Sequence, residues 1–118
     1  MKEQKRIEDR FKNYIGFERL TRGNIYLLAG FVEKELEKHT RFELWVNNVK
    51  FVEKKGKIQD AYIRVMADYF GAERGGIGFE TNRNMVGFGG WMDNESWEPI
   101  ARAFEKWMDY IIENKEVA

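Results

Sequence analysis

The spacing of the apolar residues changes twice along this 118-residue chain, and this change constrains the fold more than any other feature of the sequence. Between residues 41 and 92, apolar and polar side chains alternate, as at Phe42, Leu44 and Val46, which is typical of half-buried β-strands. On both sides of this segment, apolar residues recur every three or four positions, which indicates amphipathic helices. The pattern predicts an α+β fold with helices before and after an antiparallel sheet.

The length predicts a single domain over residues 1–118, because a chain of this size has room for one hydrophobic core. We expect this domain to contain a helical segment at 1–40, an antiparallel sheet at 41–92 and a C-terminal helix at 94–115. With 43% hydrophobic and 15% aromatic residues, the chain has enough apolar side chains to fill that core.

Three helices are predicted. The first covers residues 2–15, and the second begins after an N-cap at Thr21 or Asn24. The last helix has the strongest apolar stripe in the chain and is expected to be long, amphipathic and packed on the sheet. Its N-cap is expected within residues 93–96, and Pro99 is expected in its first turn, where a missing backbone N–H breaks no helical hydrogen bond.

The strands are expected to form a four- or five-stranded meander. Two hairpins fit the first pair of strands: one turns at residues 47–48, and the other turns at residues 55–56 and sets Val46 opposite Val65. We favour the second hairpin because it pairs apolar residues with apolar residues over a longer ladder.

The rest of the sheet is predicted as a long strand over residues 58–70 and a last hairpin from residues 77–81 and 85–91. Residues 71–76 are rich in glycine and are expected to be a loop. Such a loop can bind phosphate, but this one lacks the Lys-Ser/Thr pair of a P-loop and leads into a strand. We therefore interpret it as a simple connection.

The side-chain inventory disfavours an enzyme. The chain has no cysteine, His39 is its one histidine and Ser96 its one serine, so thiol, Ser-His and nitrogen–sulfur metal chemistry have few candidates. We expect no catalytic residue, metal or cofactor. The enzymatic alternative is a carboxylate-dependent hydrolase that uses Asp68 and Glu80 on neighbouring strands.

The lack of cysteine and of an apolar segment typical of a signal peptide predicts a cytoplasmic protein. Twenty basic and twenty acidic side chains give a formal net charge of zero, which disfavours binding to a polyanion such as DNA. The sequence has no apolar run typical of a signal peptide or a membrane span, so we expect no membrane partner.

One face of the predicted sheet has an unusual composition. Glycine inside a strand weakens it and often marks a place where another group approaches the backbone closely. Aromatic residues, arginine and methionine are common in protein interfaces. The residues predicted to bind a partner are Trp45, Tyr62, Arg64, Met66 and Trp91, around a floor of Gly78, Gly87 and Gly89, with Val49 on the same face.

These observations predict a small non-enzymatic protein-binding module of the adaptor, immunity or inhibitor type, such as a phage or mobile element encodes. Its partner would be another protein or a second copy of the chain. The alternative is single-stranded nucleic acid stacked on the same face, although Arg64 is the one clear cation there. In a third interpretation this face is not a binding site, because the first helix of the chain could cover it.

Overall fold

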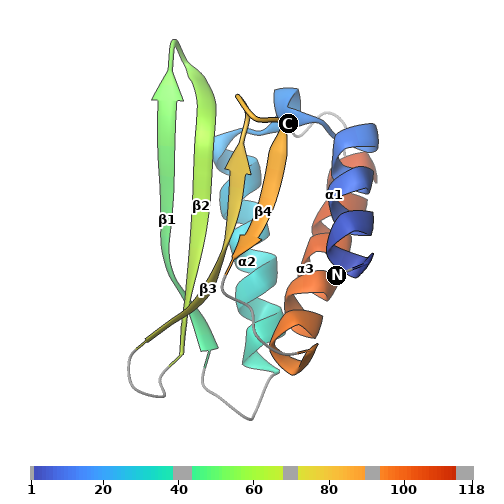
Figure 1. Ribbon diagram of the computed structural model, residues 1–118, viewed down its shortest axis with the longest axis vertical. Coiled ribbons are helices and arrows are strands. Elements are labelled where there is room, and N and C mark those ends of the chain that lie inside the picture. The colour runs from blue at the N-terminus through green and yellow to red at the C-terminus, as the bar shows by residue number, and fades with distance from the viewer. Residues whose placement is uncertain (1, 39–43, 68–71, 90–93, 114–118) are drawn as a thin grey trace.

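A four-stranded antiparallel sheet, in the order β1-β2-β3-β4, is one layer of the molecule (Figure 1). The computed structural model describes residues 2–38, 44–67, 72–89 and 94–113. Along the chain the elements are α1 (Lys2–Tyr14), the 3-10 helix η1 (Phe17–Arg19), α2 (Arg22–Glu37), β1 (Leu44–Lys54), β2 (Lys57–Ala67), β3 (Ala72–Glu80), β4 (Met85–Gly89) and α3 (Asn94–Glu113). The α+β prediction, with two helices before a meander and a long helix after it, is confirmed.

The first hairpin turns at Lys55 and Gly56, as favoured, and Val46 pairs with Val65. Both turn residues have positive φ, 55° and 79°, which matches the twist of a tight hairpin. The prediction for Val49 was wrong. A bulge between Val46 and Asn48 shifts the alternation by one residue, so Val49 pairs with Ile63 and packs against the core.

The glycine-rich segment is also different from the prediction. Strand β3 begins at Ala72, so most of the expected loop at 71–76 belongs to the sheet. Gly75 pairs with Val65, and Gly76 pairs with Arg64 of β2. The neighbouring strands therefore hold a glycine-rich backbone extended, although the local sequence is typical of a loop.

Helix α3 begins five residues before Pro99, so the prediction that this proline lies in the first turn was wrong. The ring nitrogen of Pro99 has no proton to donate to the carbonyl four residues earlier, which weakens the helix at that point. Pro99 and Ile100 are both buried, and packing against the core supports the helix there. Tertiary contacts thus outweigh the local preference.

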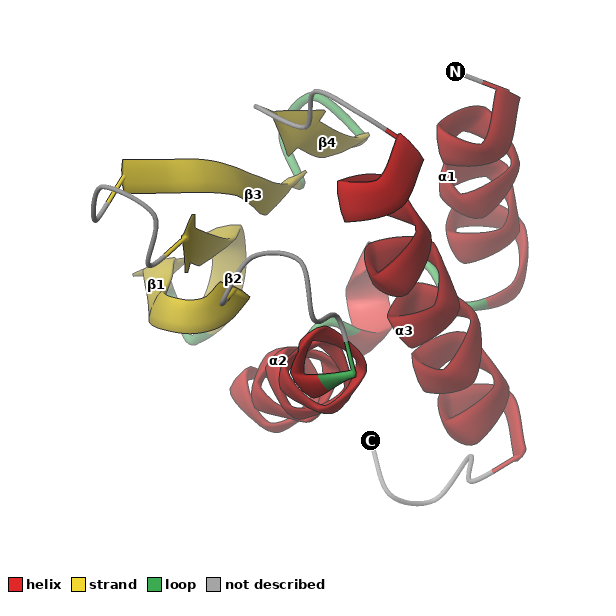
Figure 2. Ribbon diagram, turned by 90° about the horizontal axis from the view of Figure 1, so that it is seen from below, coloured by secondary structure: helices red, strands yellow, loops and turns green. Residues whose placement is uncertain are grey.

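The three helices that the structure describes lie on one side of the sheet (Figure 2). An aromatic cluster from α1, β3 and α3 fills the space between the layers. Phe11 stacks on Trp107 with ring centroids 5.9 Å apart, and both rings contact Phe79. The indole Nε1 of Trp107 donates a hydrogen bond of 2.9 Å to the carbonyl oxygen of Asn24 in α2. Trp107 therefore joins all three helices to the sheet.

Ion pairs fix α1 against α3 rather than over the other sheet face. Arg10 pairs with Glu105 and, at 2.5 Å, with Asp109, while Arg6 lies 2.7 Å from Glu105. The hydrogen bond and charge of Asp109, with those of Glu105, raise the pKa of Arg10 above its ordinary value. The reading in which the first helix covers the opposite face of the sheet is not supported by this placement.

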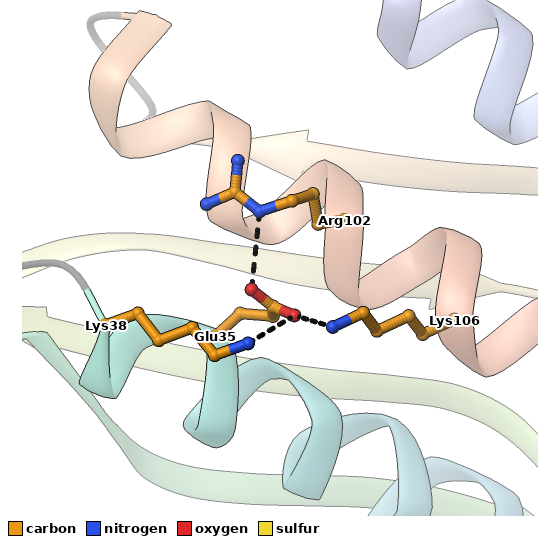
Figure 3. A network of polar contacts seen from close by, with 4 residues as sticks. All are labelled: Glu35, Lys38, Arg102 and Lys106. Atoms are coloured by element: carbon orange, nitrogen blue, oxygen red, sulfur yellow. Dashed lines mark hydrogen bonds and ion pairs between the residues drawn. The ribbon is translucent and has the colours of Figure 1, made fainter.

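A buried carboxylate joins α2 to α3 (Figure 3). Glu35 is 2% exposed and is surrounded by Arg102 at 3.3 Å, Lys38 at 3.4 Å and Lys106. Burial raises the pKa of Glu35, but hydrogen bonds from Lys106 and Arg102 and the charges of Lys106 and Lys38 outweigh it, so the pKa lies below its ordinary value of 4.5. Glu35 is therefore charged at neutral pH although it is buried.

Each edge strand of the sheet has a backbone N–H that is bound by a glutamate from a helix. The Val46 N–H in β1 donates to Glu33 of α2 at 2.9 Å. The Val86 N–H in β4 donates to Glu8 of α1 at 3.1 Å. These two carboxylates occupy donors that would otherwise be open to another strand.

Candidate functional site

The sheet face that points away from the helices is called the outer face here. Its described side chains and glycines come from all four strands and alternate with the core residues. From β1 to β4 they are Asn48, Lys50, Val52, Asp60, Tyr62, Arg64, Met66, Gly76, Gly78, Glu80, Met85 and Gly87. None of the three described helices covers this face (Figure 2).

Three of the predicted partner-binding residues meet on this face. Tyr62, Arg64 and Met66 follow one another at every second position of β2, and all three are half-buried. Trp45 pairs with Met66 in the β1–β2 ladder, but its side chain is outside the part of the structure that is described. Trp91 also lies outside the described residues.

The predicted floor is larger than the sequence indicated. Gly78 pairs with Gly87, and Gly76 pairs with Gly89, which makes a block of four glycines on two adjacent strands. Gly76 was missed because residues 71–76 were interpreted as a loop. The length of β2 is a signal that could have placed Gly76 in a strand. Because β2 continues beyond Arg64, the residues before Ile77 must extend β3 to pair with it.

Packing of the chain's own side chains explains one of these glycines. A Cβ atom at Gly76 would overlap the ring of Tyr62, which lies across it. At Gly78 the nearest atom to an added Cβ would be Tyr62 Cδ2 at 3.7 Å, and at Gly87 it would be the Gly78 carbonyl oxygen at 4.0 Å. Neither Gly78 nor Gly87 has positive φ. The fold therefore requires glycine at position 76 but has room for a Cβ atom at positions 78 and 87.

The overlap at Gly76 leads to a stability prediction. Gly76→Ala should lower the free energy of unfolding by about 1–3 kcal/mol, because the Tyr62 ring must leave its position. In a Tyr62→Ala background the same substitution should cost less than about 0.5 kcal/mol. Urea denaturation of the two single variants and the double variant measures this coupling. Equal costs in both backgrounds would contradict the contact.

A hollow of about 440 Å³ lies on the glycine floor. Tyr62 stands beside it, Gly76, Gly78 and Gly87 line it, and Asp60 and Glu80 contribute carboxylates. The remaining lining residues are Ala61, Phe79 and Phe88. The two carboxylate residues are direct cross-strand partners on β2 and β3. The hollow is therefore apolar and flat along its floor and negatively charged at one end.

A second hollow, of about 1020 Å³, lies between the β1–β2 turn, the β3–β4 turn and the start of α2. Its rim carries a formed ion pair, because Arg22 lies 2.5 Å from Glu53 and above the ring of Phe51. The hydrogen bond from Arg22 lowers the pKa of Glu53. This pair joins α2 to β1 across the hollow, which is consistent with a structural role.

Only one of the two carboxylates of the hydrolase alternative lies in the described part of the structure. Asp68, one of its two carboxylates, lies outside the described residues, and Glu80 is on the outer face beside Asp60. Among the described residues, no three histidine, aspartate or glutamate side chains gather where they could hold a metal ion.

None of the described helices is long and apolar enough to cross a membrane. Comparison with known proteins gives no relative from which a role could be transferred. No protein-family model, curated protein or solved structure matches this chain.

Proposed function

We propose that this protein is a non-enzymatic protein-binding module that docks its partner on the outer face. The observation that carries the proposal is the pair Gly78 and Gly87. Glycine within a strand costs roughly 0.5–1 kcal/mol relative to alanine, and neither the backbone angles nor the packing requires it at these two positions. A partner that approaches the backbone closely supplies the missing reason.

The surroundings of the glycines support a protein as the partner. Exposed Val52 and Met85 lie at the two ends of the rung that holds Asp60 and Glu80, so apolar and charged groups alternate across the face. Such mixing is usual at protein interfaces. A nucleic acid would meet two carboxylates beside the floor, and a formal net charge of zero adds no attraction.

A side chain at Gly87 should separate binding from folding. Gly87→Thr adds a β-branched side chain to the floor, where its Cβ makes only an ordinary van der Waals contact, so the free energy of unfolding should stay the same or rise by about 0.5–1 kcal/mol. Binding should weaken at least tenfold because the side chain occupies the docking surface. Proteins from the source cell that the immobilised chain retains can be identified by mass spectrometry, and the affinity of the purified partner can be measured by calorimetry.

Gly30→Ala is the matched control. Gly30 is an exposed glycine of α2, on the helix side, where an added Cβ meets nothing within 4 Å. A partner retained by the parent and by Gly30→Ala but lost by Gly87→Thr supports the proposal. Equal retention by both variants overturns it, and so does a single-stranded oligonucleotide that binds the parent but not Gly87→Thr.

A further inference from the structure

Among the residues that the structure describes, the charged side chains that line the hollow on the outer face have one sign. Asp60 and Glu80 are its charged lining residues, and they face each other directly across β2 and β3. Like charges in this cross-strand position repel and destabilise the sheet. Free energy is therefore available to a cation that comes between them.

None of the lysines and arginines in the described part of the chain lines this hollow. Arg83 forms an ion pair with Glu80, but its side chain is 73% exposed, its Nη1 lies 3.8 Å from the carboxylate, too far for a hydrogen bond, and it is not part of the lining. Lys50 and Arg64 are on the same face, opposite Tyr62 and Gly76, and neither is part of the lining. The negative end of the hollow is thus distinct from the positive side chains of β1 and β2.

We infer that this hollow receives the side chain of an arginine or lysine from the partner protein. The inference rests on the proposed function and names the chemistry by which the outer face recognises its partner. The aliphatic stem would lie on Gly78 and Gly87 beside the Tyr62 ring, and the charged end would reach Asp60 and Glu80.

The dimensions of the site agree with this occupant. Gly78 and Glu80 are two residues apart on β3, which is about 7 Å along a strand, a length that an extended lysine or arginine stem spans. The bare floor lets the stem lie flat, and an aromatic wall beside it suits a cationic side chain. A calcium ion fits less well, since it takes about six to eight oxygen ligands and no three ligand residues gather here among the described side chains.

The test is a titration of the 118-residue chain in which binding is monitored by the chemical shifts of the backbone amides. The probes are N-acetyl-arginine-N-methylamide and the corresponding citrulline compound, which has nearly the same shape but no charge. We expect the arginine probe to shift the amides of Gly76, Gly78 and Gly87 and to bind at least fivefold more tightly than the citrulline probe. Added salt should weaken the arginine probe because its partners are partly exposed charges.

Two variants complete the test. Asp60→Asn with Glu80→Gln removes both charges at nearly constant shape, and should abolish the preference for arginine. It should not unfold the protein, because the repulsion between the two carboxylates is removed with them. Glu37→Gln, an exposed site of α2 on the helix side, is the control and should keep the preference.

The possible outcomes separate this inference from the proposed function. Equal affinity of the arginine and citrulline probes, with shifts at the same glycines, overturns the inference and leaves a protein-binding face without a charge preference. Shifts confined to the larger hollow near Arg22 also overturn it. If no probe shifts the outer face while a partner still depends on position 87, the inference fails and the proposed function stands.

Discussion

Replacing Trp107 by alanine is expected to lower the free energy of unfolding by about 3–5 kcal/mol, the usual loss for a fully buried large aromatic residue. The side chain is 0% exposed and contacts the rings of Phe11, Phe79 and Phe104, so no single helix can move to fill the space. Small domains are typically stable by about 5–15 kcal/mol. Urea denaturation followed by circular dichroism should therefore show a midpoint far below that of the parent.

Trp107→Phe separates packing from hydrogen bonding. It keeps most of the ring but removes the donor to the carbonyl oxygen of Asn24, so a loss of about 1–3 kcal/mol is expected from the unsatisfied acceptor. A loss below about 1 kcal/mol for Trp107→Ala would show that the three helices do not depend on this side chain.

The second large effect is expected when the buried carboxylate loses its partners. In the double variant Arg102→Met/Lys106→Met, Glu35 stays buried with Lys38 as its one remaining cation among those described around it. An uncompensated buried charge should lower the free energy of unfolding by about 3 kcal/mol at pH 7. Glu35→Gln should cost less, about 1–2 kcal/mol, because the cations it leaves are about half exposed and return to water.

The same carboxylate determines a pH dependence. Since the pKa of Glu35 is lower in the folded chain than the ordinary 4.5, it stabilises the fold above that pH, and this stabilisation is lost as the pH falls through the folded value. The advantage of the parent over the double variant should therefore shrink as the pH falls, because protonation of Glu35 removes the charge that Arg102 and Lys106 compensate. Denaturation curves at pH 7 and at successively lower pH measure the difference. A gap that widens in acid would contradict the assignment.

The sequence predicts the elements that depend on local periodicity. The alternation around Val46 and Val65 and the turn at residues 55–56 are enough to choose the correct hairpin, since both the turn angles and the apolar pairs agree. The helices follow from their apolar stripes. Alternation alone also places Tyr62, Arg64 and Met66 of β2 on one face of the sheet. It likewise places Gly78 and Gly87 on that face.

The parts that the sequence does not predict depend on contacts between distant segments. Nothing local marks the bulge that returns Val49 to the core. The sequence around Gly76 is typical of a loop. The reason for glycine at this strand position is the ring of Tyr62, which is fourteen positions earlier in the chain and lies across it. The side of the sheet on which α1 packs depends on the contacts of Phe11 and Arg10 with α3. The apolar stripe of α1 shows that the helix packs against something, but not that it packs against α3.

The two glutamates at the sheet edges also affect how this protein can associate. An incoming chain that extends the sheet at Val46 or Val86 must first expel a carboxylate from the N–H that it binds. Ordered growth by adding molecules side to side, as in amyloid, therefore meets an energetic barrier at each border. A contact made on the outer face would leave both carboxylates in place, so docking there would not open the sheet edges to polymerisation.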